Sequence, residues 1–380
     1  SGALVVSQRT QVMLHETYHG NESKRIFGLD LFRAIAILLV VMAHGGFIIE
    51  VAIPGFPGFS VPDGVELFFV LSGFLIGGIL IHLIESNQLE NLKDLLQFWK
   101  RRWLRTLPAY YLVLIINLFF AWSGLTNAKT ENFSWKFLLF IHNFHSPFTD
   151  FFWESWSLSI EEWFYIIAPI LLLIVAAIFK SRFGAKTTIL FVIIVLTALP
   201  LFYRLSLSDV KLDAFWFDVT FRKTVVTRLD AIMYGVFVAW LWKYQNHFMK
   251  KCKWWFFATG VLILFFTKSH LSDDPTGFDS MTWGFSAMGL GTSFLLPFAA
   301  SWENCKWPGA KTITHVSLIS YSMYLINLGL VAMVIEKHFM PVNAIQSVVI
   351  YITYWIIVVT GSTLLYKHFE KPMTDLRDRF

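Results

Sequence analysis

The chain has 380 residues, of which 56% are hydrophobic and only 15% are charged, and its mean hydropathy is +0.57. Soluble domains usually carry nearer a quarter of charged residues, so this composition excludes an ordinary soluble protein and predicts a polytopic membrane protein. The formal net charge of +5 is no sign of nucleic-acid binding, because most of the Lys and Arg residues fall in loops on one side of the predicted bundle.

Apolar stretches close to the length that crosses a bilayer recur along the whole chain. They predict an all-α membrane bundle of about ten transmembrane helices. The seventh stretch, near Trp254 to Phe266, is short for a transmembrane helix. The expected spans are 31–50, 64–83, 107–124, 157–179, 187–203, 226–242, 254–267, 282–300, 313–335 and 346–366.

The loops predict how the bundle is oriented. Of the 31 Lys and Arg residues, 21 lie in segments on the same side as the N-terminus, so both termini are expected in the cytoplasm. Cys252 and Cys305 then face the reducing side, and no disulfide is expected. We expect a cytoplasmic segment at 1–25, a membrane domain at 26–372 and a cytoplasmic tail at 373–380.

The first expected helix carries two ionisable residues, Arg33 and His44. Their separation is about three helical turns, so they lie near one face and roughly 16 Å apart. Ionisable groups inside a bilayer are costly and mark functional sites, and the unperturbed pKa of histidine suits proton transfer near neutral pH. The alternative is a snorkelling arginine and a histidine that bonds a neighbouring carbonyl.

The second expected helix begins near Glu66. A short loop joins it to the first helix, so Glu66 is expected to approach His44 and to fix the tautomer of its imidazole. The alternative is that a carboxylate simply favours a helix N-terminus. Ser72 and Gly73 in the same helix favour close helix packing over a nucleophilic role.

Four cations precede the third span, namely Lys100, Arg101, Arg102 and Arg105. Arginine binds phosphate through two parallel hydrogen bonds, so the cluster suits a phosphorylated ligand. Basic clusters also anchor helices on anionic lipid, and by itself this cluster favours the anchor.

The fourth expected helix opens with tryptophans and carboxylates. The carboxylates could position or deprotonate a hydroxyl group, and the indole rings could stack on sugars. The alternative is an interfacial aromatic belt with acidic residues at a helix start. The residues in question are Trp153, Trp156, Glu161, Glu162 and Tyr165.

The remaining polar groups favour structural roles. Arg228 and Asp230 share the sixth expected helix, where the simplest interpretation is that they neutralise each other. His142 and His145 are three residues apart but lack supporting ligands, so no metal site is expected.

Together these segments resemble the integral-membrane acyltransferase-3 family, which includes bacterial O-acetyltransferases of surface polysaccharides. Glu66 stands where the family commonly has Asp, and Asn327 where it commonly has His. Asn cannot accept a proton at neutral pH, so we expect no acid–base role for Asn327. The matching motifs are Arg33-x10-His44, Gly64-Val-Glu66-Leu-Phe-Phe-Val-Leu-Ser-Gly-Phe74, Arg101-Arg102-x-x-Arg105-x-x-Pro108, Trp156-Ser-Leu-x-x-Glu161-x-x-Phe-Tyr165, Thr227-Arg228-x-Asp230, Ser320-Tyr321-Ser-x-Tyr324-Leu325 and Phe369-Glu370-Lys371-Pro372.

The resemblance implies an O-acyltransferase of the bacterial inner membrane. The expected donor is acyl-CoA, usually acetyl-CoA, and the expected acceptor is a hydroxyl of an extracytoplasmic glycan or glycolipid such as lipopolysaccharide. His44 would act as general base while the acceptor approaches from outside past Glu161. The expected site residues are Arg33, Arg101, Arg102 and Arg105 for the donor, His44, Glu66 and Glu161 for catalysis, and Trp153, Trp156, Glu162 and Tyr165 for the acceptor.

Two other classes remain open. A transporter or flippase of lipid-linked sugar would also place charges inside the membrane. Membrane-bound O-acyltransferases of a different type use a histidine on a later helix, and the position of His44 in the first helix argues against them. Direct transfer and a transient acyl-enzyme are both compatible with the sequence.

Overall fold

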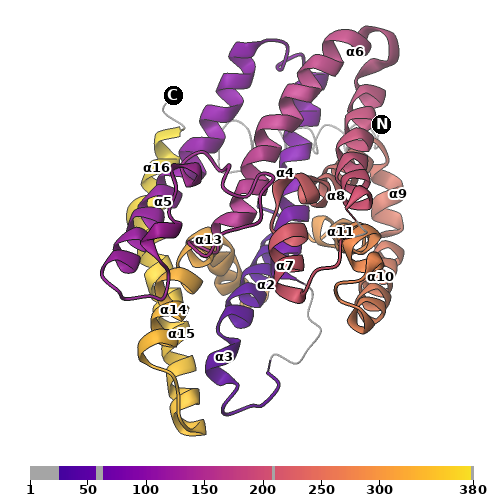
Figure 1. Cartoon of the computed structure of the whole chain (residues 1–380). Coiled ribbons are helices and arrows are strands. Elements are labelled where there is room, and N and C mark those ends of the chain that lie inside the picture. The colour runs from indigo at the N-terminus through magenta and orange to yellow at the C-terminus, as the bar shows by residue number, and fades with distance from the viewer. Residues whose placement is uncertain (1–24, 57–62, 208–209, 378–380) are drawn as a thin grey trace.

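The structure is a computed structural model that describes residues 25–56, 63–207 and 210–377 (Figure 1). The predicted segment 1–25 and the end of the predicted tail, 378–380, lie almost wholly outside these ranges. The described part of the chain contains helices and no strand, which confirms the all-α prediction. Eight helical segments in it are long and apolar enough to cross a membrane, and the protein is an integral membrane protein.

The described elements follow the order of the predicted spans. The helices are α2 (Phe27–His44), α3 (Gly46–Ile49), α4 (Gly64–Glu85), α5 (Leu92–Trp122), α6 (Ser155–Ser206), α7 (Ala214–Phe217), α8 (Val225–Tyr244), α9 (Asn246–Lys251), α10 (Lys253–Asp273), α11 (Phe285–Ser293), α12 (Leu296–Ala300), α13 (Ala310–Ile326), α14 (Met333–His338), α15 (Ala344–Leu365) and α16 (Lys371–Arg377). Short 3₁₀ or π turns are η1 (Thr130–Asn132), η2 (Trp135–Phe137), η3 (Asp218–Arg222), η4 (Ser280–Gly284), η5 (Asn327–Ala332) and η6 (Tyr366–Glu370).

Helix α6 contains two of the predicted spans, 157–179 and 187–203. Its two limbs meet at Gly184, where φ is 74° and ψ is 163°. Only glycine adopts such a backbone conformation readily. The chain reverses there, and the second limb returns beside the first at the upper right of Figure 1.

The predicted span 282–300 is not a single helix. It is divided among η4, α11 and α12, so the prediction of one regular span is wrong here. Pro297 lies in the first turn of α12, where its missing N–H costs no hydrogen bond. Helix α10, by contrast, continues to Asp273 and is longer than its predicted span.

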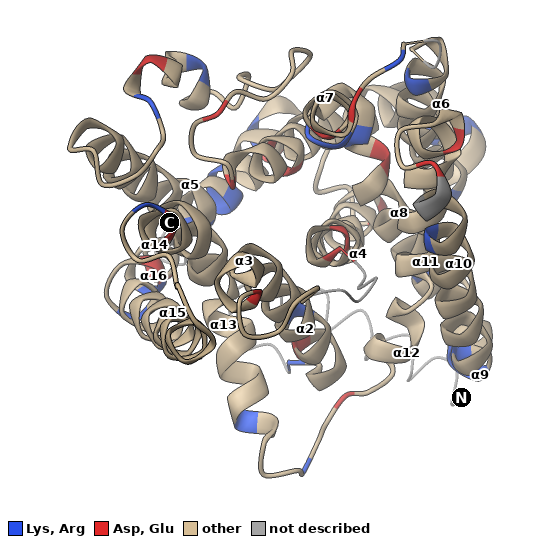
Figure 2. Cartoon of the chain, turned by 60° about the horizontal axis from the view of Figure 1, so that its bottom comes forward, with Lys and Arg blue, Asp and Glu red and all other residues tan. Residues whose placement is uncertain are grey.

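Helix α4 lies inside the ring formed by the other helices (Figure 2). It contacts α2, α6, α8 and α11. A Cβ atom on Gly73 would lie 1.9 Å from the carbonyl oxygen of Ile232 in α8, so this position admits only glycine. The predicted role of Gly73 in close helix packing is confirmed.

The end of α2 is fixed by a neighbouring helix. The Tyr354 hydroxyl of α15 donates to the carbonyl oxygen of Val41 at 3.0 Å, and its ring leaves no room for a side chain on Gly45. His44 is therefore the last residue of α2, held at a break between α2 and α3.

Candidate functional site

Two neighbouring cavities enter the bundle around α4. The arginine cavity has a volume of about 390 Å³ and is lined by Arg25, Arg33, Arg102 and Arg105 together with apolar side chains of α4. The histidine cavity has a volume of about 400 Å³. It is lined by His44 and by polar and aromatic residues of the 63–65, 153–156 and 222–223 segments.

The arginine cavity brings together arginines from two helices, and Lys243 of α8 also lines it. Arg33 comes from α2, while Arg102 and Arg105 lie one turn apart on α5. The Arg102 guanidinium donates to the Tyr165 hydroxyl at 2.6 Å. Arg101 was predicted with them but is not among the lining residues. Arg25, which the sequence analysis did not single out, lines the cavity instead.

Glu161 belongs to the arginine cavity rather than to the histidine cavity. Its carboxylate accepts hydrogen bonds from the hydroxyls of Ser72 and Tyr165. Glu162 turns to α5, where it accepts from the Trp103 indole at 3.1 Å and from the Thr106 hydroxyl at 2.9 Å. Glu161, Glu162 and Tyr165 are therefore not gathered around His44.

Asn327 is the hydrogen-bond partner of His44. Its amide nitrogen donates to the carbonyl oxygens of Met323 at 2.8 Å and Tyr324 at 2.9 Å. The amide oxygen is consequently turned to His44 Nδ1, 2.6 Å away. An amide oxygen only accepts, so Nδ1 must carry the proton. Nε2 is then left with a lone pair and suits a proton acceptor.

Glu66 does not serve as the partner of His44. Its carboxylate forms a buried ion pair with Arg228 of α8. Asp230, expected to neutralise Arg228, is paired instead with Arg204 of α6 at 2.8 Å. The predicted pairings of Glu66 with His44 and of Asp230 with Arg228 are both wrong, because each carboxylate forms its ion pair with an arginine of a different helix.

The predicted acceptor residues Trp153 and Trp156 both line the histidine cavity. The Lys223 ammonium lies 4.4 Å from the centre of the Trp153 ring, and the Arg222 guanidinium lies 5.2 Å from the centre of the Trp156 ring. Arg222 also donates to the Asp63 carboxylate at 3.1 Å. Burial raises the pKa of Asp63, but the charge and hydrogen bonds of Arg222 outweigh it and hold that pKa below its usual value.

Glu154 is a residue of the histidine cavity that the sequence analysis missed. It precedes α6 and is 1% exposed. Its Oε1 atom accepts from the Gly329 N–H at 2.6 Å, while Oε2 is buried without a hydrogen-bond partner among the described residues. Burial raises its pKa to about 7. The π turn η5 thus holds both Glu154, through Gly329, and His44, through Asn327.

The raised pKa of Glu154 makes stability depend on pH. The unfolded carboxyl titrates near 4.5 and the folded one near 7. The stabilisation by its bound proton is therefore complete below pH 4.5 and is lost as the pH rises towards 7. We expect Glu154→Gln to remove this loss, which is on the order of 3 kcal/mol for such a shift. Thermal unfolding between pH 4.5 and 8 measures it, and equal pH dependence in both proteins would contradict the expectation.

Among the described residues, no group of three or more His, Cys, Asp or Glu side chains is placed to hold a metal ion.

Comparison with known proteins adds the family. A family model described as an acyltransferase domain matches residues 26–367. A putative O-acetyltransferase of Staphylococcus aureus is 27% identical over 379 residues, which cover 91% of this chain and 56% of the relative. The peptidoglycan O-acetyltransferase OatA of Listeria monocytogenes is 35% identical over 171 residues, which cover 40% of this chain and 25% of the relative.

A putative peptidoglycan O-acetyltransferase of Bacillus subtilis is 35% identical over 190 residues, which cover 45% of this chain and 27% of the relative. The chain spans about half the length of the relatives that match it over most of its residues. No solved structure matches it significantly. The family match covers nearly the whole described bundle, and the chain belongs to this family of membrane-embedded acyltransferases.

Proposed function

We propose that the protein is a membrane O-acyltransferase that moves an acetyl or other short acyl group from acyl-CoA to a hydroxyl group of a cell-surface glycan. The observation that carries the proposal is the pair of adjoining cavities. One has free space among arginines, and the other contains an imidazole whose Nε2 is available as a base.

The arginine cavity suits the donor. Arginines are suited to the phosphates of CoA, and the apolar wall of α4 suits the pantetheine arm. Arg33 makes none of the hydrogen bonds found among the described residues, so its guanidinium is available to a ligand. The surplus of Lys and Arg in the loops on this side supports a cytoplasmic opening. Extended pantetheine is long enough to span the roughly 16 Å between Arg33 and His44.

The histidine cavity suits the acceptor. Indole rings stack on sugars, and the ends of α4 and α6 near Trp153 and Trp156 would face outside in the predicted orientation. Two relatives are named as peptidoglycan O-acetyltransferases, one of them putatively. On that basis we propose a peptidoglycan-like glycan as acceptor rather than lipopolysaccharide.

The proposed reaction is a direct transfer. The hydroxyl proton of the acceptor passes to Nε2 of His44, and the hydroxyl oxygen forms an ester bond with the acyl carbon. The carbon–sulfur bond breaks, and the CoA thiolate takes the proton from His44. Asn327 holds the imidazole in the tautomer that this step requires.

The decisive experiment is a transfer assay with purified protein in detergent. Acetyl-CoA and a peptidoglycan tetrasaccharide are supplied, and free CoA thiol and the mass of the glycan are measured. We expect thiol release together with a glycan heavier by one acetyl group. A transporter or flippase would produce neither, and that result would overturn the proposal.

Substitutions in the arginine cavity test the donor site. Arg102→Ala and Arg105→Ala are each expected to weaken CoA binding about tenfold or more, because each removes a charge-assisted contact. Binding should also weaken with ionic strength. Titration calorimetry with CoA measures both effects. Arg101→Ala is the matched control, since it removes the same charge from the same helix outside the cavity lining. Unchanged affinity in both variants would favour a lipid anchor.

A further inference from the structure

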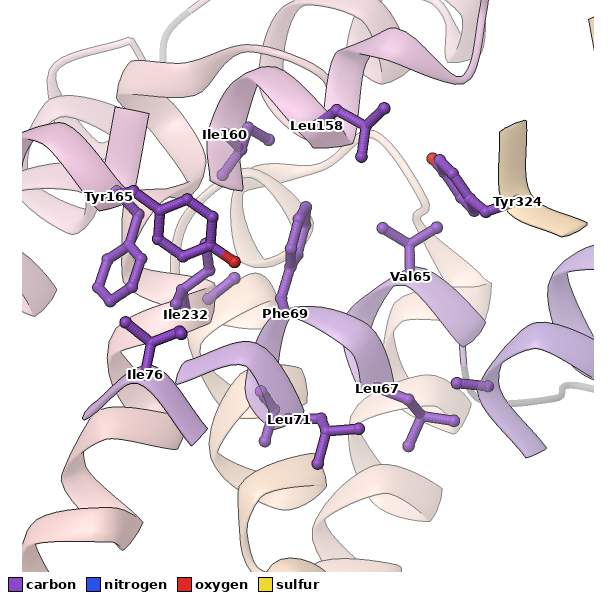
Figure 3. Close-up of a cluster of buried hydrophobic side chains, with 14 of the residues drawn as sticks. Val65, Leu67, Phe69, Leu71, Ile76, Leu158, Ile160, Tyr165, Ile232 and Tyr324 are labelled. Atoms are coloured by element: carbon purple, nitrogen blue, oxygen red, sulfur yellow. The ribbon is translucent and has the colours of Figure 1, made fainter. Parts of the chain in front are cut away.

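Among the residues that the structure describes, Val65 and Tyr324 are the two that line both cavities. Val65 lies in the first turn of α4, and Tyr324 lies near the end of α13. Each residue is 6% exposed, so both are buried where the two cavities meet. Figure 3 shows Val65 on its helix and the Tyr324 ring extending from the neighbouring helix towards it.

The two residues are held differently. The Tyr324 hydroxyl donates to the carbonyl oxygen of Glu154 at 3.1 Å and is 2.5 Å from the Ser157 hydroxyl. The ring of Phe68 packs edge-on against it at 6.3 Å between centroids. These contacts therefore hold the Tyr324 side chain in one position. The isopropyl group of Val65 makes no such bonds, so its size can change without disturbing a hydrogen bond.

We infer that Val65 and Tyr324 form the constriction through which the acyl end of the donor reaches His44, and that its width limits the enzyme to short acyl groups. This inference rests on the proposed function. Arg33, Arg102 and Arg105 line one cavity and His44 lines the other, so the thioester of a donor bound to these arginines must come to this junction. A narrow passage lined by these two buried side chains discriminates between acyl groups by their length.

Substitution of Val65 tests the constriction. The kcat/KM values for acetyl-CoA and butyryl-CoA are measured with a peptidoglycan tetrasaccharide. Val65→Ala is expected to raise the butyryl-to-acetyl ratio about tenfold, since one or two methylene groups in an apolar pocket have an effect of this size. Val65→Phe is expected to lower acetyl transfer at least tenfold. Val70→Ala is the matched control, because it makes the same substitution in α4 at a buried residue that is not among the lining residues of either cavity.

Binding of CoA and of octanoyl-CoA to the same variants distinguishes a failure of the constriction from a failure of the proposed function. CoA, which carries no acyl group, should bind all Val65 variants as tightly as the wild type, and this also shows that they are folded. If neither acyl transfer nor CoA binding occurs in the wild type, the proposed function fails and the constriction fails with it. If the wild type transfers acetyl groups and binds CoA, but Val65→Ala and Val65→Phe leave the donor ratio and octanoyl-CoA affinity unchanged, the constriction alone is overturned.

Discussion

His44→Ala is expected to lower the rate of acyl transfer by about 10²–10⁴-fold, the usual contribution of a positioned general base. The affinity for CoA should stay the same, because His44 lines the histidine cavity, whereas Arg33, Arg102 and Arg105 line the other. The measurement is release of CoA thiol in the presence of a peptidoglycan tetrasaccharide, together with calorimetric binding of CoA.

Met42→Ala is the matched control. Met42 lies on the same helix and lines the same cavity, but it has no group that accepts a proton. Its transfer rate should remain within a few-fold of the wild type. Normal turnover by a folded His44→Ala protein would exclude His44 as the base. The hydrogen bond between His44 and Asn327 would then serve only the packing of the helices.

The general architecture could be predicted from the sequence because it depends on local signals. Length and hydropathy identify the spans, and a helical spacing places Arg33 and His44 on α2. The break inside 282–300 was missed, although Pro297 stands there, because an apolar stretch of that length has the same composition whether or not it is one helix.

The pairing of buried charges could not be predicted, because it depends on which helices become neighbours. Glu66 is close to His44 along the chain, yet its partner is Arg228, 162 residues away. Arg204 directly follows the predicted span 187–203, so the sequence placed it in a loop. It is fully buried, because the second limb of α6 continues past it and packs on α8.

Asn327 illustrates the same limit at the site itself. The expectation that it has no acid–base role stays a prediction, while the structure shows its amide oxygen 2.6 Å from His44 Nδ1. Its function as partner of His44 was not visible, since 283 positions separate the two residues. Glu154 was overlooked because a carboxylate beside tryptophans at a helix start is typical of an interfacial belt.

The buried pair of Arg204 and Asp230 should dominate the stability of the bundle. The guanidinium donates to both carboxylate oxygens, at 2.8 and 3.1 Å, and to the Ser286 hydroxyl at 2.8 Å and the Thr282 carbonyl at 3.1 Å. Their side chains are 0% and 1% exposed. The pair joins the second limb of α6 to α8 and to the broken segment that follows α10.

Arg204→Leu is expected to lower the free energy of unfolding by about 3–5 kcal/mol, because it leaves the Asp230 carboxylate buried without its counter-charge. The double variant Arg204→Leu with Asp230→Leu should lose less than Arg204→Leu alone, since it removes both charges and fills the space with apolar groups. Unfolding in detergent at one pH gives the free energy of unfolding of the wild type, the two single variants and the double variant, which together form a double-mutant cycle. Arg182→Leu, at an exposed position near Gly184, should change stability by no more than about 0.5 kcal/mol. A double variant that loses the sum of the two single losses would mean that the charges act independently and that their pairing does not hold the helices together.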